Sequence, residues 1–383
     1  MTALNTSATF VPGRLEQMST RIAFFIAGFG IAAWAPLVPY AKDRAGLDEA
    51  TLGLLLLCLG VGSILAMPMA GVLASRFGCR RVLSGGTVLI CLALPLLATV
   101  SSVPLLMATL FLFGAGLGTV DSTVNLQAVI VERASGKTMM SGFHGLFSLG
   151  GIVGAAGVSA LLGLGLSPLG AMLVVIVILL AALAKAAPHL LAYGSERSGP
   201  AFAVPHGVVL LIGSLCFVVF LAEGAALDWS AVFLVSERGL ETAYAGLGYA
   251  AFALTMTVGR LTGDGIVRRL GATRVIVFGG TLAAAGLLLT VLVPAWEAAL
   301  LGYALLGAGC SNIVPVLYTA VGKQRVMPES IAVPAITTLG YAGILAGPAV
   351  IGFIAHGSSL SFAFVLIALL LLAVAITGKV LKV

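Results

Sequence analysis

Twelve long apolar runs follow one another along the chain, and each is long enough to cross a lipid bilayer. A bilayer core of about 30 Å needs about 20 residues of helix. Only 9% of the 383 residues are charged, whereas about a quarter of a soluble domain is charged. The sequence therefore predicts an all-α membrane protein with spans at approximately 19–40, 51–73, 82–100, 103–130, 140–164, 168–186, 207–235, 242–264, 274–293, 297–320, 330–354 and 360–378.

The runs form two sets of six, and related charged stretches follow the second and the eighth run. GVLASRFGCRRVL starts at Gly71, and GRLTGDGIVRRLGATRV starts at Gly259, 188 positions later. A period close to half the chain indicates an internal repeat. We therefore predict two six-helix bundles with pseudo-two-fold symmetry. The predicted parts are a cytoplasmic N-terminal tail at 1–18, a first bundle at 19–187, a cytoplasmic linker at 188–205 and a second bundle at 206–383.

Basic residues concentrate on one side of this arrangement. Sixteen of the 20 Lys and Arg fall on the side of the termini, and the exceptions are Lys42, Arg44, Arg238 and Arg260, the last within a span. The positive-inside rule therefore places both termini in the cytoplasm. The net charge of +6 follows from this topology and does not indicate a nucleic-acid partner. Because residues 1–18 lack the pattern of a signal peptide, we expect the first run to be a retained helix.

The first charged stretch resembles the loop signature G-x-L-A-D-R-x-G-R-R of the major facilitator superfamily. The matching residues are Gly71, Leu73, Ala74, Arg76, Gly78 and Arg80. The resemblance implies a transporter fold in which this loop and its second copy gate the cytoplasmic side. The gating residues that it implies are Gly71, Arg76, Gly78, Arg80, Asp264, Arg268 and Arg269.

One position departs from that signature. Its aspartate is Ser75 here, whereas Asp264 is present in the second copy. If that acid anchors a closed gate in the family, the first latch is weakened in this chain. The alternative is that the arginines are topology anchors without a gating role, while the glycines let the helix ends pack closely.

An acid in the fourth run is a candidate proton carrier. Asp121 and Asn125 are four residues apart in GAGLGTVDSTVNLQ, so both side chains lie on one face of a helix. A charged side chain at a helix centre costs about 2.5 to 3.5 kcal/mol on insertion scales, so its presence favours a function. We predict that Asp121 couples protons and that Asn125 binds solute. The alternative is a buried aspartate that only ties helices together.

Other polar and aromatic residues within the runs are candidate solute ligands. They are Trp34, His144, Glu223, Asp228, Trp229 and Asn312. Glu223 is also a second candidate proton carrier, whereas Asp228, about 140° further around the helix, fits an interfacial residue equally well. His144 and Trp34 also fit packing positions. Asn312 precedes Pro315 by three residues, and a proline there predicts an irregular helix.

Three of the runs resemble the fucose:proton symporter-like branch of the superfamily. GLGTVDSTVN is similar to its pattern G-L-G-x-x-E-x-x-x-N, with Asp121 and Asn125 on the acid and the asparagine. FLAEGAALDWS places Glu223 on the glutamate of its V-G-x-E segment, and CSNIVPVLYT is similar to its tenth-helix pattern S-x-x-x-P-T-x-F. The first-helix acid of that branch is absent from IAAWAPLVP, where Trp34 offers an aromatic face. The resemblance implies either coupling through the two remaining acids alone or a different solute.

These patterns predict a secondary active transporter that moves a small, possibly sugar-like solute by alternating access, driven by protons. No Walker-type G-x-x-x-x-G-K-[ST] stretch occurs, so an ion gradient is the expected energy source. A proton-driven exporter of amphipathic drugs or metabolites is the alternative within this class. A membrane-embedded enzyme would need a metal or nucleophile cluster, and a receptor would be expected to carry a soluble domain. We expect a monomer in the bacterial inner membrane without cofactor, metal or enzyme activity, whose partners are solute, protons and lipid.

The predicted topology can be tested by labelling. Single cysteines placed within 188–205 of a cysteine-free variant should stay unlabelled by an impermeant maleimide in intact cells, because the linker is predicted to be cytoplasmic. A cysteine at Gly239, in a loop predicted to be external, serves as the positive control. Labelling of the linker in intact cells would contradict the twelve-span arrangement.

Overall fold

A computed structural model describes residues 12–47, 49–195, 204–241, 244 and 246–379, and every regular element within them is a helix. The first half contains α1 (Arg14–Ala32), η1 (Ala35–Leu37), α2 (Val38–Ala45), α3 (Glu49–Phe77), α4 (Cys79–Thr99), α5 (Val103–Ser135), α6 (Met140–Gly163), α7 (Pro168–Ala186) and η2 (Ala187–His189). The second half contains α8 (Gly207–Ser236), α9 (Leu247–Leu270), α10 (Ala272–Leu292), α11 (Trp296–Cys310), α12 (Ile313–Val321), α13 (Glu329–Gly357) and α14 (Leu360–Thr377).

These helices form the predicted twelve spans. Within the described residues, eleven segments are long and apolar enough to cross a membrane; α1 with η1 and α2 forms one of them, and α11 with α12 another. The twelfth, α9, carries Arg260 and Asp264 within its length, and these charges lower its mean hydropathy. It packs against α6, α8 and α11 like the other spans. The boundaries differ most at three spans. The first, α1, begins at Arg14 rather than 19, α5 ends at Ser135 rather than 130, and α9 runs five or six residues later than predicted.

The two halves repeat details of the backbone and of helix capping. Gly78 and Gly271 precede α4 and α10 with φ angles of +83° and +81°, a region that glycine adopts readily. Arg44 donates to three carbonyls at the C-terminal end of α4, and Arg238 donates to two at the C-terminal end of α10. Cations at these ends complement the helix dipole. This explains why two arginines lie on the side opposite the termini, where basic residues are otherwise scarce. The matching capping of α4 and α10 also supports the internal repeat.

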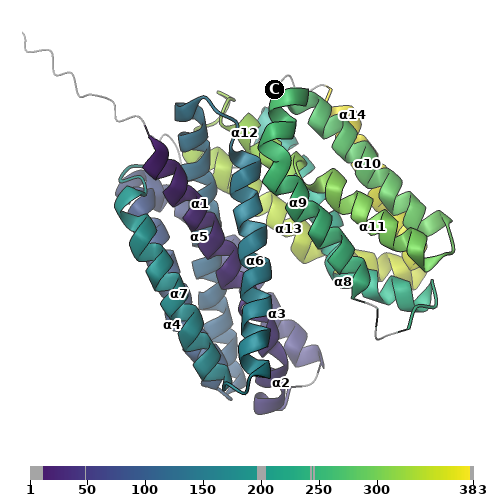
Figure 1. Cartoon of the computed structure of the whole chain (residues 1–383), viewed down its shortest axis with the longest axis horizontal. Helices are drawn as coiled ribbons and strands as arrows, with labels where there is room; N and C mark the ends of the chain where they lie inside the picture. Colours follow the sequence, from purple (N-terminus) through teal and green to yellow (C-terminus); the bar gives the residue numbers. More distant parts are fainter. Residues whose placement is uncertain (1–11, 48, 196–203, 242–243, 245, 380–383) are drawn as a thin grey trace, which may run out of the picture.

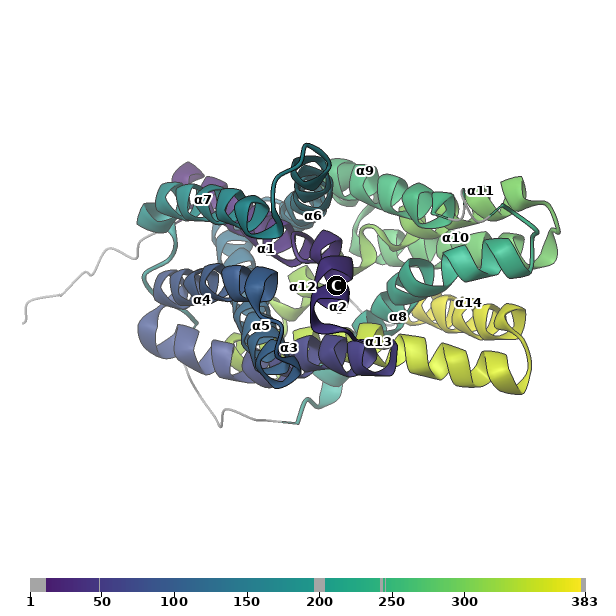
Figure 2. The same ribbon diagram turned by 90° about the horizontal axis from the view of Figure 1, so that it is seen from below.

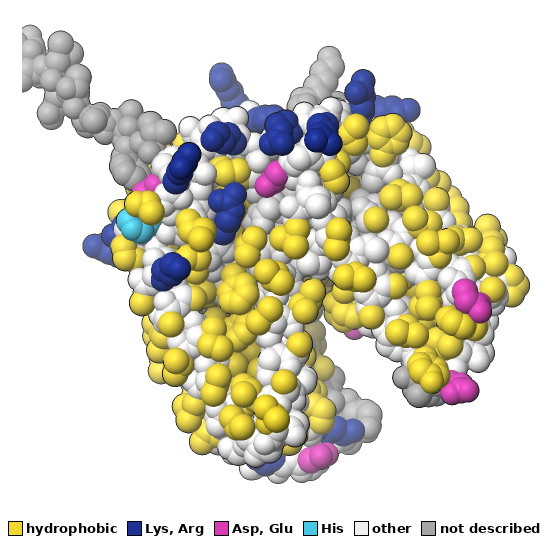
Figure 3. Space-filling view, viewed as in Figure 1, with side chains coloured by type: hydrophobic (Ala, Val, Ile, Leu, Met, Phe, Trp, Pro, Cys, Tyr) yellow, Lys and Arg dark blue, Asp and Glu magenta, His cyan; other side chains and the backbone are white. Residues whose placement is uncertain are grey.

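The two bundles lie side by side and meet mainly towards one end (Figure 1). Across the interface α3 packs on α13 and α6 packs on α9. Figure 3 shows Lys and Arg gathered at the end where the bundles meet, and a cleft between the bundles at the opposite end. We call these the basic end and the open end. Viewed from the open end, α12 lies between the two bundles near the centre of the molecule (Figure 2).

Glycines allow α3 and α5 to approach almost to backbone contact. A methyl group on Gly62 would collide with the backbone of Phe111, and one on Gly118 would collide with the backbone of Ser63. The Ser63 hydroxyl in turn donates to the carbonyl of Gly114 over 2.8 Å. Small residues and cross-helix hydrogen bonds of this kind drive helix association in membranes. The contact fixes the stretch of α5 that carries Asp121.

Gly118→Val should therefore destabilise the protein, because the new side chain has no space against α3. Overpacking of this kind costs about 1 to 3 kcal/mol or more, so the melting temperature of the purified protein should fall. The control is Gly157→Val on α6, where an added Cβ meets no described atom within 4 Å. Equal melting temperatures of the two variants would contradict the close packing of α3 and α5.

Candidate functional site

Asp121 lies at the interface between the bundles. It sits on α5 and is only 8% exposed. The hydroxyl of Tyr341 on α13, which belongs to the other bundle, faces its carboxylate. Among the described residues Asp121 forms no ion pair. Tyr341 is absent from the sequence-based predictions, because a single tyrosine in an apolar run belongs to no motif there.

Asn125 follows Asp121 by one helical turn and is almost fully buried. Its Nδ2 donates to the backbone carbonyl of Asp121 over 2.9 Å, which fixes the orientation of the amide. Its Oδ1 is buried and has no hydrogen-bond partner in the described structure. A buried acceptor without a partner costs about 1 to 3 kcal/mol. A ligand that donates to this oxygen would recover that cost.

Glu223 on α8 is ion-paired with Arg260 on α9. The Nη2 of Arg260 lies 3.1 Å from Oε1 of Glu223, and the two side chains are 6% and 15% exposed. Nη1 of Arg260 donates to Oγ of Ser148 on α6 over 2.9 Å, and its Nε donates to the carbonyl of Ser311 over 3.4 Å. Arg260 therefore joins three helical segments and both bundles.

Arg260 was given no role from the sequence, although a signal was present. A cation in the middle of an apolar span is as costly as an acid there, and such residues are paired or functional by default. The positive-inside argument treats Arg260 only as an exception to the charge bias. What the sequence lacks is any sign of its partner, because Glu223 lies 37 positions away on another helix.

Asn312 lies at a break between α11 and α12. The helix stops at Cys310 and resumes at Ile313, so the irregularity predicted from Pro315 is present a few residues before that proline. The Nδ2 of Asn312 donates to the carbonyl of Gly259 and to Oγ of Ser311, both over 3.0 Å. The side chain of Asn312 thus ties the break to the backbone of α9, while its Oδ1 is buried without a partner among the described residues.

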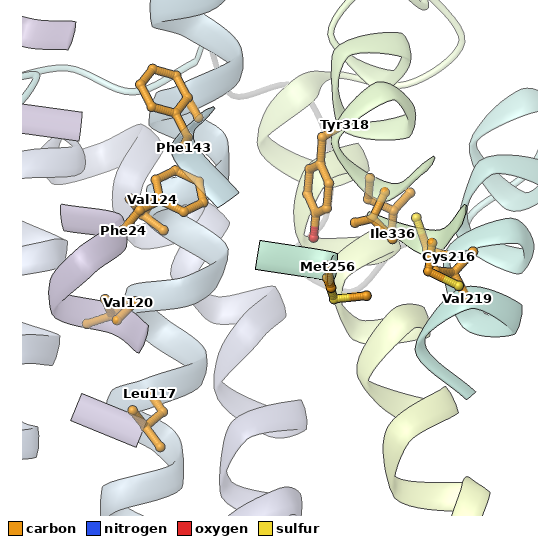
Figure 4. Packing of buried hydrophobic residues seen from close by; sticks show 14 of the residues in the cluster. Phe24, Leu117, Val120, Val124, Phe143, Cys216, Val219, Met256, Tyr318 and Ile336 are labelled. Carbon is orange, nitrogen blue, oxygen red and sulfur yellow. The ribbon is translucent and has the colours of Figure 1, made fainter. Parts of the chain in front are cut away.

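His144 lies in a group of aromatic rings between the bundles. Its ring centroid is 5.2 Å from that of Phe24 on α1 and 5.5 Å from that of Tyr318 on α12. Figure 4 shows Phe24 and Phe143 facing Tyr318 across the interface. The Tyr318 hydroxyl lies 2.7 Å from that of Thr337. The Nε2 of His144 is buried without a partner among the described residues, so its packing role leaves one nitrogen free to bind.

The remaining predicted ligands form no hydrogen bond with these groups among the described residues. Trp34 is buried at the junction of α1 and η1, and its indole nitrogen has no partner in the part of the chain that the structure describes. Trp229 is half-buried and its ring lies beside Gly352 of α13. Asp228 is exposed, in keeping with the interfacial alternative. The structure does not bring Asp228 into contact with Glu223.

At the basic end, acids hold the first turn of α6. Oδ1 of Asp264 accepts a hydrogen bond from the backbone N–H of Gly142 over 3.1 Å, across the bundle interface. Oε2 of Glu132 accepts from the N–H groups of Met139 and Met140, both over 2.7 Å. Carboxylates at a helix N-terminus are stabilised by its free N–H groups and dipole. The second bundle thus supplies one of the two caps of α6.

Two further contacts join the bundles at the basic end. The Thr319 hydroxyl of α12 donates to Glu132, and Arg133 of α5 is ion-paired with Glu329, the first residue of α13. Neither acid was a candidate from the sequence, because both lie near helix ends where charges are common. Their roles depend on the pairing of helices from different bundles, which no local pattern specifies.

The residues of the first arginine loop contact different parts of the protein: one packs on the other bundle, one bonds within its own bundle and one is exposed. Gly71 packs against the backbone of Ser330, across the interface on α13. Arg80 instead donates to the carbonyls of Pro188 and Leu190, in the segment after α7 of its own bundle, over 2.6 Å and 3.0 Å. Arg76 is exposed, with its guanidinium 5.1 Å from the ring centroid of Phe77. Arg268 and Arg269 are exposed at the end of α9.

Comparison with known proteins places this geometry in a family. Residues 21–330 match the family described as Major Facilitator Superfamily. An uncharacterized MFS-type transporter of Yersinia pestis is 55% identical over 369 residues, with 96% of each chain covered. Membrane protein MosC of Rhizobium meliloti is 31% identical over 365 residues, which cover 93% of this chain and 88% of MosC.

Solved structures show the same fold at low sequence identity. The fucose:proton symporter FucP of E. coli superposes with a TM-score of 0.77 at 16% identity, covering 96% of this chain and 98% of that one. The human organic anion transporter MFSD10 superposes with a TM-score of 0.74 at 15% identity, covering 95% and 99%. The family predicted from the arginine loops is thereby confirmed. The chain belongs to the major facilitator superfamily.

Proposed function

We propose that the chain is a secondary active transporter that moves a small polar solute across the bacterial cell membrane and couples this movement to protons through Asp121. The position of Asp121 carries the proposal: it is a buried acid between the bundles, without an ion pair among the described residues, and it faces the hydroxyl of Tyr341 in the opposite bundle. An ionised carboxylate only accepts hydrogen bonds, whereas a protonated one also donates. Proton binding therefore changes the contact between the bundles.

Alternating access follows from the two ends of the molecule. The basic end is held closed by Asp264, Glu132 and Glu329, while the open end has a cleft. With both termini and the linker in the cytoplasm, as the charge bias predicts, this is an outward-facing state. A structure of FucP in the outward conformation superposes with a TM-score of 0.78, which supports the proposed outward-facing state. Inward opening would require the contacts at the basic end to break.

A polar solute fits the unpartnered groups near the interface. The Oδ1 of Asn125 and the Nε2 of His144 are both buried and unpartnered in the described structure. Hydroxyl or amine groups of a solute would supply their partners, and the flat ring of Trp34 would pack against its apolar face. Glu223 and Asn312 complete the proposed ligands, and Asp228 and Trp229 are proposed contacts towards the open end.

Export of amphipathic compounds is the second candidate function. The aromatic group of Phe24, Phe143, His144 and Tyr318 favours it, because such rings bind apolar surfaces with little loss of side-chain entropy. Thermal-shift measurements against sugars, nucleosides, amino acids and cationic drugs separate the two, since a ligand that binds the folded state raises the melting temperature.

Asp121→Asn should abolish pH-driven accumulation of the identified solute in proteoliposomes but retain exchange of solute at equal pH. The amide keeps the shape of the side chain and cannot exchange a proton. The control is Glu237→Gln, an exposed acid at the end of α8, which should behave as the wild type. Accumulation by Asp121→Asn with normal proton movement would show that another residue carries the proton.

Asp264→Asn should shift the protein towards the inward-open state. A hydrogen bond to a charged group contributes about 1.5 to 3 kcal/mol, so its weakening should raise the open population up to about tenfold. Modification of a Ser141→Cys reporter, buried beside Gly263 in the closed state, should become correspondingly faster in inside-out vesicles. Asp43→Asn, an exposed acid at the open end, is the control. Equal rates with and without Asp264→Asn would remove Asp264 from the gate.

A further inference from the structure

Three charged side chains lie deep within the membrane spans that the structure describes. Asp121, Glu223 and Arg260 are each ten residues or more from both ends of their helices. Two are acids and one is a base, so with all three ionised the set carries one net negative charge. The distribution of these charges decides which acid can exchange a proton without leaving a buried charge unpaired.

Arg260 is ion-paired with Glu223 and not with Asp121. Its Nη2 contacts Oε1 of Glu223 over 3.1 Å, its Nη1 donates to Ser148 and its Nε donates to the Ser311 carbonyl. All three guanidinium nitrogens are therefore engaged, and the geometry is fixed from three sides. Asp121 receives no share of this cation, because Arg260 is paired with Glu223 and the group that faces Asp121 is the phenol of Tyr341.

The other titratable groups that face the two acids are tyrosines and cysteines. Those facing Glu223 are Tyr249 of α9, Tyr341 of α13, Cys310 of α11 and Cys216 of its own helix. Tyr341 of α13 and Tyr318 of α12 face Asp121. His144 of α6 is the titratable group of the first bundle that faces Arg260. In the described structure, Arg260 is thus the one cation paired with either interior acid.

We propose that Arg260 is the positioning residue that assigns the transported proton to Asp121: by holding Glu223 as a carboxylate, it leaves a single exchangeable acid and one proton per cycle. Protonation of Asp121 makes the interior set neutral, since Glu223 and Arg260 cancel. A neutral set is less costly to keep in a low-dielectric interior than one with an unpaired charge. The bundles therefore exchange conformations most readily with one proton bound.

This inference rests on the proposed proton-coupled transport, and it can be tested before the solute is known. A protonated carboxyl group has a C=O stretch that disappears on ionisation, and infrared difference spectra of the reconstituted full chain at several pH values report it. The variants are Asp121→Asn, Glu223→Gln, Arg260→Gln and Arg260→Lys, with the double variant Arg260→Gln/Glu223→Gln. Arg238→Gln is the matched control, because Arg238 is a half-buried arginine bonded to backbone carbonyls of Thr290 and Val291.

The expected wild-type spectrum contains a titrating carboxyl band that Asp121→Asn removes and Glu223→Gln leaves in place. Arg260→Gln should add a second band, because Glu223 loses its cation. That band should be absent from Arg260→Lys, from Arg238→Gln and from the double variant. The double variant also guards against misfolding, since neutralising both partners of a buried pair is far milder than removing one.

The outcomes separate this inference from the proposed function. The absence of a new band in folded Arg260→Gln overturns the role of Arg260 and leaves coupling through Asp121 intact. Loss of the wild-type band in Glu223→Gln assigns that band to Glu223 and overturns both the role of Arg260 and coupling through Asp121 alone. A band unaffected by Asp121→Asn overturns the proposed coupling itself. Once the solute is known, Arg260→Gln should raise the ratio of protons to solute, measured with a lumenal pH dye, from one towards two.

Discussion

Polar groups inside a lipid bilayer must find their partners within the protein, and the whole architecture follows from this constraint. Backbone groups satisfy it through twelve helical spans. Lipid gives these helices no hydrophobic reason to associate, so close glycine packing and hydrogen bonds between helices do so instead. The contact of Gly118 with the backbone of α3 and the hydrogen bond from Ser63 are examples within one bundle. Because an unpaired polar group in the bilayer is costly, each interior polar residue indicates either a partner within the protein or a function.

The contacts between the bundles combine helix packing, of α3 on α13 and of α6 on α9, with a set of polar contacts. At the basic end Asp264 caps α6 from the opposite bundle and Glu329 pairs with Arg133. In the interior Tyr341 faces Asp121, and Arg260 donates to Ser148. Hydrogen bonds can be exchanged for others at a modest net cost, whereas a large apolar interface cannot be opened cheaply. These polar contacts therefore suit a protein whose halves separate and meet again.

The two halves of the chain have similar backbone conformations at corresponding positions, but the side chains at those positions differ. Gly78 and Gly271 have nearly the same φ, yet Asp264 has only Ser75 at the corresponding place in the first loop. The Ser75 hydroxyl bonds within its own helix, to the carbonyl of Val72. On that side of the molecule the ion pair of Arg133 and Glu329 joins the bundles instead. Two halves with one helical plan thus close the basic end by different chemistry.

The sequence by itself determined the helices, their number, the repeat and the family, because apolar length and local motifs are properties of contiguous residues. It also singled out Asp121 and Glu223, since an acid within an apolar run is costly wherever it points. Only the tertiary structure decided that Glu223 is paired with Arg260 and that Asp121 meets Tyr341. These partners lie on different helices, and in the second case in different bundles. Which polar groups meet depends on helix rotation and packing, and no local spacing encodes that.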